Sequence, residues 1–169
     1  VIDAEAQANL NTHIAEMKDR ARLVWSGEVP AGAAGSFVPP HIFELSSFTD
    51  LQSEAFGPIL HVCRWRAGDL DKVISAINST GYGLTFGLHS RLETLADYVV
   101  PRIHAGNIYI NRNTIGAIVG VQPFGGMGLS GTGPKAGGPL YLTRFLEEKT
   151  VSNNTTAAGG NASLIAMAD

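Results

Sequence analysis

The chain has 169 residues, a net charge of −3 and one cysteine, and it is 44% hydrophobic and 16% charged. Such a balance is typical of a globular domain rather than a disordered or fibrous chain. The negative charge offers no basic field for nucleic acid or anionic lipid. No apolar run approaches the ~20 residues that span a bilayer. We therefore expect no nucleic-acid contact and no transmembrane segment.

The cysteine count and the first residues bear on location. A single cysteine excludes an internal disulfide, which fits a reducing, cytoplasmic setting. Residues 1–5 have neither a basic region nor an apolar core, so we expect no signal peptide. A start at Val1 that runs straight into a helix suggests a segment cut from a longer parent chain. These features are also compatible with a parent protein that associates peripherally with a membrane.

The first third of the chain predicts a helix, a loop and a strand. Apolar residues recur about once per helical turn over 3–20, with Asp3 available as the N-cap. Glycine, proline and alanine dominate 27–35, which predicts a loop. Residues 38–45 are extended in character, and their two prolines favour an edge or entry strand.

The middle third predicts an alternation of strands and helices. In chain order the expected elements are a strand over 59–65, a helix from the Asp69 cap to Gly81, a strand over 84–88, a helix over 90–101 and a strand over 107–111. Ser90 and Glu93 have the spacing of a capping box at the start of the second helix. Short connections of this kind predict parallel pairing with right-handed crossovers.

The last third is dominated by a glycine-rich loop over 113–139, whose length is typical of a functional loop. A short helix is expected over 140–145 and a polar strand over 149–154. The remaining residues, 155–169, are rich in Ala, Gly and Asn, and we expect them to fray.

Within that loop, Gly126, Gly128 and Gly131 fit the Gly-X-Gly-X-X-Gly dinucleotide pattern. That pattern works only where a strand precedes it and a helix begins inside it. Pro123 precedes it and Pro134 obstructs a following helix. We therefore favour backbone that needs positive φ and close approach over a Rossmann turn.

Cys63 and the histidines give weak signals. Cys63 shares one side of the expected strand with His61, and a buried structural thiol is the default interpretation. A stand-alone thiol enzyme using both residues stays an alternative, although activation needs an exposed electropositive niche. The five histidines show no ligand spacing, so we expect no metal site.

Several longer runs resemble a known family. These are Glu54-Ala55-Phe56-Gly57-Pro58, the run 105–113, the run 116–126 that continues to Gly131, and Gly133-Pro134-Lys135-Ala136-Gly137-Gly138-Pro139. They resemble the aldehyde dehydrogenase superfamily, in particular its L-glutamate-γ-semialdehyde (Δ1-pyrroline-5-carboxylate) dehydrogenase branch. The closing run 154–162 is similar to the form found in bifunctional proline utilization enzymes, where a proline dehydrogenase precedes it.

The resemblance implies a fold and a set of site residues. The fold would be part of an α/β, parallel-sheet, three-layer catalytic domain, with 1–148 as its C-terminal half and 149–169 as an oligomerisation-type strand and tail. Without the resemblance, the run 54–58 would be interpreted as a surface glutamate followed by a turn. By resemblance, Glu54 holds the NAD ribose and Phe56 packs beside the nicotinamide. The residues implied for the semialdehyde are Ile115, Gly116 and Ala117, whose backbone N–H groups bind its α-carboxylate, and Phe124, which packs on its stem.

The resemblance also implies a reaction that this chain does not complete. Family members use a cysteine upstream of the Glu-X-Phe-Gly-Pro run, and Cys63 lies downstream of it. We therefore assign no catalytic residue and expect the chain alone to be inactive, with the rest of the parent chain as partner. Exposed sheet edge and apolar surface would favour self-association. The alternative is a non-catalytic assembly or ligand-binding module derived from the same fold.

Overall fold

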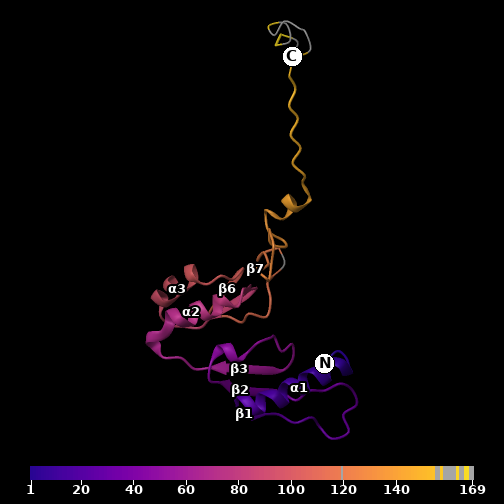
Figure 1. Ribbon diagram of the computed structural model, residues 1–169, viewed down its shortest axis with the longest axis vertical. Helices are drawn as coiled ribbons and strands as arrows, with labels where there is room; N and C mark the ends of the chain where they lie inside the picture. The colour runs from indigo at the N-terminus through magenta and orange to yellow at the C-terminus, as the bar shows by residue number, and fades with distance from the viewer. Residues whose placement is uncertain (119, 155–156, 158–162, 164–165, 168–169) are drawn as a thin grey trace.

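The computed structural model describes residues 1–118, 120–154, 157, 163, 166 and 167. Figure 1 shows two packed bodies and an extended C-terminal arm. The helices and strands are α1 (Ala4–Arg20), β1 (Arg22–Ser26), β2 (His41–Leu45), β3 (Ile59–Cys63), α2 (Leu70–Ser79), β4 (Tyr82–Gly83), β5 (Thr85–Leu88), α3 (Glu93–Val99), β6 (Asn107–Ile110) and β7 (Met127–Gly128). The α/β class is thus confirmed.

In the first body, α1 packs on a three-stranded sheet. The Asp3 carboxylate accepts from the Ala6 N–H at 2.7 Å and caps the helix, as predicted. The buried face of α1 meets the apolar face of β2 in one core cluster: Leu10, Ile14, Met17, Val38, Phe43 and Leu45. The amphipathic period of 3–20 therefore becomes the packing face of the helix.

The position of β2 corrects the sequence prediction. The strand lies in the centre of its sheet, antiparallel to β1 and parallel to β3. The two prolines precede His41, whose N–H donates to the Pro58 carbonyl, so neither proline interrupts the pairing. The prediction that this strand lies at the edge of its sheet was wrong, and the sequence did not predict β1.

The second body packs α2 and α3 on the parallel pair β5–β6. Its buried core is Ile74, Val99, Ile103 and Ala105. The parallel pairing of the strands over 84–88 and 107–111 is confirmed. The strand over 59–65 does not join them, because in the described residues β3 pairs only with β2.

Two local predictions differ from the structure. The capping box at Ser90 does not form: α3 begins at Glu93 with Leu92 as its N-cap and no side-chain cap. Ser90 is instead held by Asn111, which makes 2.9 Å hydrogen bonds with both its N–H and its carbonyl. Asn111 adopts φ 54°, and this bent backbone brings its amide back to Ser90.

The chain after β6 is largely irregular. β7 pairs antiparallel with β4, and Phe124 forms a bridge with Ala136. The helix expected over 140–145 is a 3₁₀ turn over Tyr141–Phe145. Residues 149–154 form no strand and run out as the arm of Figure 1. Most of the tail expected to fray, 155–169, lies outside the described residues.

The residues that the structure describes provide neither a membrane span nor a metal site. No helix there is long and apolar enough to cross a membrane. Nor does that part of the chain group three or more His, Cys, Asp or Glu side chains in a way that could hold a metal ion.

Candidate functional site

The Glu54–Phe56 segment enters β3 with two side chains turned outward. Glu54 is exposed and has no hydrogen-bond partner among the described residues, and Phe56 is 88% exposed. The residues between and after them face the protein. Ala55 packs against the core cluster of α1, and a side chain at Gly57 would collide with Leu10. This alternation packs Ala55 and Gly57 against the protein and leaves the side chains of Glu54 and Phe56 exposed to solvent.

The loop after β6 presents backbone N–H groups. Ile115 is 92% exposed, and its N–H is used locally, by the Asn113 side chain at 3.4 Å. The N–H groups of Gly116 and Ala117 have no acceptor within the described part of the chain. Of the three groups that the sequence singled out, two are therefore available to an anion.

Arg112 and Gln122 fix the two ends of this loop. Arg112 donates to the Gly116 carbonyl at 3.1 Å, and its guanidinium lies 4.3 Å from the centre of the Tyr109 ring. Gln122 Oε1 accepts from the Ile118 N–H at 3.0 Å. Val119 lies outside the described residues.

Phe124 is half-buried, and a buried amide clamps the chain on both sides of it. Asn107, at the start of β6, donates to the Pro123 carbonyl at 3.0 Å and accepts from the Gly125 N–H at 3.2 Å. Asn107 is 8% exposed. Sequence reasoning missed both Asn107 and Arg112. Both residues lie in the run 105–113 that resembles the family, but polar residues that bracket an apolar strand are common and did not indicate a role.

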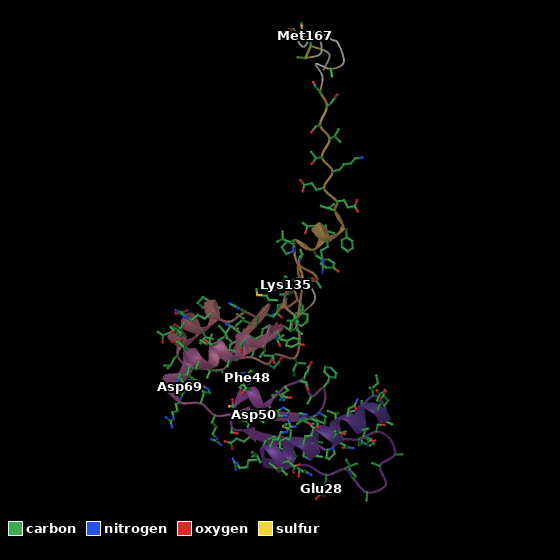
Figure 2. All side chains as sticks on the ribbon, viewed as in Figure 1. Glu28, Phe48, Asp50, Asp69, Lys135 and Met167 are labelled. Carbon is green, nitrogen blue, oxygen red and sulfur yellow. The ribbon has the colours of Figure 1, made fainter. Side chains whose placement is uncertain are left out.

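The glycine motif is not a dinucleotide turn. Gly128 lies in the short strand β7, Gly126 and Gly131 lie on either side of that strand, and no helix begins inside the motif. Gly128 has φ +59°, as expected of a position that needs glycine. Cβ atoms at Gly126 or Gly131 would strike neighbouring backbone, so the close approach is to the protein itself. Figure 2 places Lys135 where this loop leaves the second body toward the arm.

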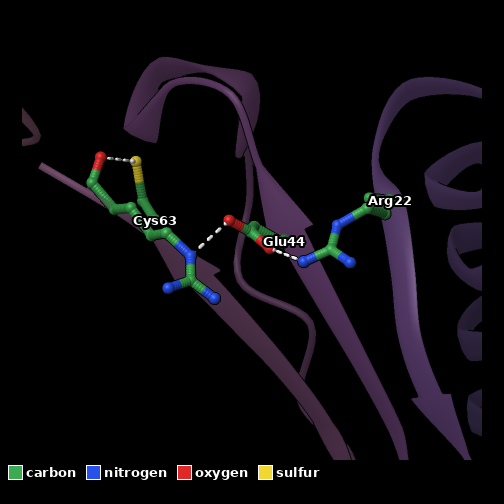
Figure 3. A network of polar contacts seen from close by, with 4 residues as sticks. Arg22, Glu44 and Cys63 are labelled. Carbon is green, nitrogen blue, oxygen red and sulfur yellow. Dashed lines mark hydrogen bonds and ion pairs between the residues drawn. The ribbon is translucent and has the colours of Figure 1, made fainter.

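Cys63 is partly exposed at the end of β3, so the expectation of a buried thiol was wrong. Its Sγ makes only a 3.8 Å contact with the Arg64 carbonyl, while His61 contacts His13. Figure 3 shows Cys63 beside the Arg22–Glu44–Arg64 cross-strand network. Hydrogen bonds from Arg22 and then Arg64 lower the pKa of Glu44, which keeps this carboxylate ionised. Nothing there activates the thiol.

The two parts of the site lie on different bodies. Glu54 and Phe56 precede β3, whereas the 115–117 loop and Phe124 follow β6, and no hydrogen bond joins the two groups in the described residues. The structure thus arranges each half locally without bringing both halves together.

A family model described as "Aldehyde dehydrogenase family" matches residues 1–151. The chain belongs to the aldehyde dehydrogenase family. The bifunctional protein PutA of Rhizobium meliloti is 58% identical to it over 147 residues, which is 86% of this chain and 12% of PutA. A 1-pyrroline-5-carboxylate dehydrogenase of Bacillus subtilis is 39% identical over 154 residues, which is 90% of this chain and 29% of that enzyme.

Solved structures give the same result. A PutA mutant from Bradyrhizobium japonicum is 58% identical, with a TM-score of 0.83, over 93% of this chain and 16% of that one. A Thermus 1-pyrroline-5-carboxylate dehydrogenase with bound NAD is 39% identical, with a TM-score of 0.77, over 87% of this chain and 28% of that one. The chain therefore has part of the aldehyde dehydrogenase fold and spans a small part of the length of its relatives.

Proposed function

We propose that this chain is part of an NAD-dependent dehydrogenase that oxidises L-glutamate γ-semialdehyde to L-glutamate in proline catabolism. One observation carries the proposal: the same segment matches both bifunctional PutA proteins and separate 1-pyrroline-5-carboxylate dehydrogenases. The activity that both groups share is the dehydrogenase step. Residues 1–148 would supply the C-terminal half of the catalytic domain, and 149–169 a segment for subunit association.

Glu54 and Phe56 suit an NAD site in chemistry and exposure. A carboxylate without a protein partner accepts hydrogen bonds from both hydroxyls of a ribose. An exposed phenyl ring offers a flat apolar surface to a nicotinamide. The cofactor, when bound, supplies the hydride acceptor.

The loop after β6 suits the carboxylate end of the substrate. The unpaired N–H groups of Gly116 and Ala117 are adjacent, and the small residues there leave the backbone accessible to an anion. Ile115 would contribute its exposed side chain rather than its N–H. Phe124, held by Asn107, would pack on the aliphatic stem of the semialdehyde.

The nucleophile and the general base would come from the rest of the parent chain. A thiolate attacks the aldehyde carbon, the hydride leaves for the cofactor, and water then hydrolyses the thioester to the acid. Within the described part of the chain, the Cys63 Sγ contacts only the Arg64 carbonyl, so we assign it no step. The proposed partners are the remaining parent domains, including a proline dehydrogenase, and further copies of the chain, in the cytoplasm or peripherally at a membrane.

The exposed arm favours a second candidate, an assembly module without catalysis. The apolar side chains of the arm, and of the 3₁₀ turn that precedes it, are largely exposed. Leu140, Leu142, Phe145, Leu146 and Val151 are 64–78% exposed. Such a surface is typical of an interface. In this case the residues assigned to ligand binding would be inherited from the fold and would bind no ligand.

Calorimetric titration of NAD, and of glutamate as product analogue, separates the two candidates. Both ligands are titrated into the 169-residue chain and into the full-length polypeptide that contains it. Binding to the longer polypeptide, together with NAD-dependent oxidation of the semialdehyde, is the expected result. Binding of neither ligand to the longer polypeptide would favour the assembly module. Tight binding to the short chain would contradict the division of the site between two halves of a catalytic domain.

A further inference from the structure

Arg112 makes three contacts just beyond the end of β6. Its Nε donates to the Asn113 carbonyl at 3.2 Å, and its Nη2 donates to the Gly116 carbonyl at 3.1 Å. Its guanidinium also lies over the Tyr109 ring at 4.3 Å. Among the described residues it forms no ion pair. The planar fork of Arg112 therefore holds two carbonyls of the loop near one aromatic ring.

The aromatic ring is a fixed support. Tyr109 is 5% exposed and lies in β6, paired with Gly87 of β5. A guanidinium over a tyrosine face is attracted by the ring quadrupole. The position of Arg112 is thus set by the sheet rather than by the loop that it holds.

The contact with the Gly116 carbonyl orients the next N–H group. In a trans peptide the C=O of one residue and the N–H of the next point in opposite directions, and none of the peptide bonds that the structure describes is cis. Drawing the Gly116 carbonyl toward Arg112 therefore turns the Ala117 N–H away from Arg112. That N–H has no acceptor in the described part of the chain.

Gln122 closes the loop from its other end. Its side chain accepts from the Ile118 N–H at 3.0 Å, and its own N–H donates to the Ile118 carbonyl at 2.9 Å. Arg112 and Gln122 both line a hollow of about 450 Å³ along β6. The N–H groups of Gly116 and Ala117 lie between these two anchors.

We propose that Arg112 is a positioning residue that orients the 116–117 backbone to receive a carboxylate. The inference rests on the proposed function, because it takes the α-carboxylate of the semialdehyde as the ligand of that backbone. Arg112 touches the loop carbonyls rather than the reacting atoms. Its loss should weaken recognition of the carboxylate and leave cofactor binding and chemistry in place.

The test compares two aldehydes in the full-length polypeptide. Lysine keeps the charge of Arg112 but cannot hold two carbonyls and a ring at once. For Arg112→Lys we expect KM for L-glutamate γ-semialdehyde to rise about tenfold with little change in kcat. KM for NAD and for pentanal, which has no carboxylate, should stay unchanged. The control is Arg91→Lys, since Arg91 is exposed and makes no hydrogen bond or ion pair in the described residues.

Two further variants keep the test decisive if Arg112→Lys does not fold. Arg112→Gln removes the fork with a smaller side chain, and Tyr109→Leu removes the ring that supports it. Each should raise KM for the semialdehyde but not for pentanal. A wild-type protein that does not oxidise the semialdehyde would refute the proposed function. A wild-type protein that does, with KM unchanged in these variants or raised equally for both aldehydes, would overturn the role of Arg112.

Discussion

His13 Nε2 and His61 Nε2 lie 2.9 Å apart and join α1 to β3. The two rings meet edge to face, with centroids 5.1 Å apart, and His61 also stacks on Phe43. One imidazole donates and the other accepts, so at least one ring must be neutral. The contact therefore makes the docking of α1 sensitive to pH.

We expect the stability of the first body to fall with His61 protonation. Burial, and then the charge of His13, lower the pKa of His61 below its ordinary value of 6.5. A group whose pKa is lower in the folded state stabilises the fold fully above the unfolded-state pKa. That contribution is lost as pH falls from about 6.5 through the folded-state pKa. Urea unfolding at pH 8 and pH 5 should show this loss in the wild type and less of it in His61→Gln.

The matched control for this experiment is His89→Gln. His89 is exposed and has no hydrogen-bond partner in the described residues. Its replacement should leave the pH dependence of unfolding as it is in the wild type. An equal pH dependence in His61→Gln and wild type would contradict the role given to the His13–His61 pair.

Tyr109→Phe should stabilise the chain. The Tyr109 hydroxyl is buried and has no hydrogen-bond partner among the residues that the structure describes, and such a group costs about 1–3 kcal/mol relative to water. Phenylalanine keeps the ring beneath Arg112 and removes the hydroxyl. We expect the free energy of unfolding to rise by about 1 kcal/mol, measured by urea titration. Tyr82→Phe, at a ring that is 65% exposed, should change nothing; a loss of stability in Tyr109→Phe would show that the hydroxyl has a partner.

Gly106→Ala should displace the glycine-rich loop. A Cβ at Gly106 would strike the Gly125 carbonyl, which is backbone and cannot rotate away. We expect a loss of about 1–3 kcal/mol in the free energy of unfolding, as for other overpacked sites. Gly68→Ala is the control, since a Cβ there meets nothing within 4 Å and Gly68 has no positive φ. Equal stability of the two variants would refute the close approach of 106 and 125.

Local periodicity explains which parts of the fold were predictable. The apolar spacing of 3–20 became the buried face of α1, because a single helix can bury only one stripe. The pairing of β5 with β6 followed from the intervening helix α3, which forces a parallel return. In both cases residues that are close in the sequence determine the structure, so it can be predicted locally.

Longer-range contacts explain what was missed. Nothing within 38–45 reveals that β1 covers one edge of β2 and β3 the other. Ser90 had the right spacing for a cap, but Asn111, 21 residues away, holds its backbone instead. Tertiary hydrogen bonds outweighed the local rule in both places.

The candidate site likewise contains residues that could be predicted from the sequence and residues that could not. The resemblance named Glu54, Phe56, the 115–117 loop and Phe124, and the structure shows which of their groups are exposed or unpaired. Asn107 and Arg112 lie in the run 105–113 that carries the resemblance, but nothing in that run indicated what they bind. Their role depends on carbonyls up to 16 residues away in the chain, which only the folded loop brings within reach.

The role of Glu54 gives the sharpest check on the cofactor site. Its carboxylate is exposed and unpartnered among the described residues, so replacing it should not disturb the fold. In the full-length polypeptide, Glu54→Gln should raise KM for NAD about tenfold, because an amide accepts fewer ribose hydrogen bonds. KM for the semialdehyde should stay constant in the same steady-state assay. Glu16→Gln, an exposed position on α1, serves as the control. An unchanged KM for NAD in Glu54→Gln would place the ribose elsewhere and leave the exposed carboxylate as ordinary surface charge.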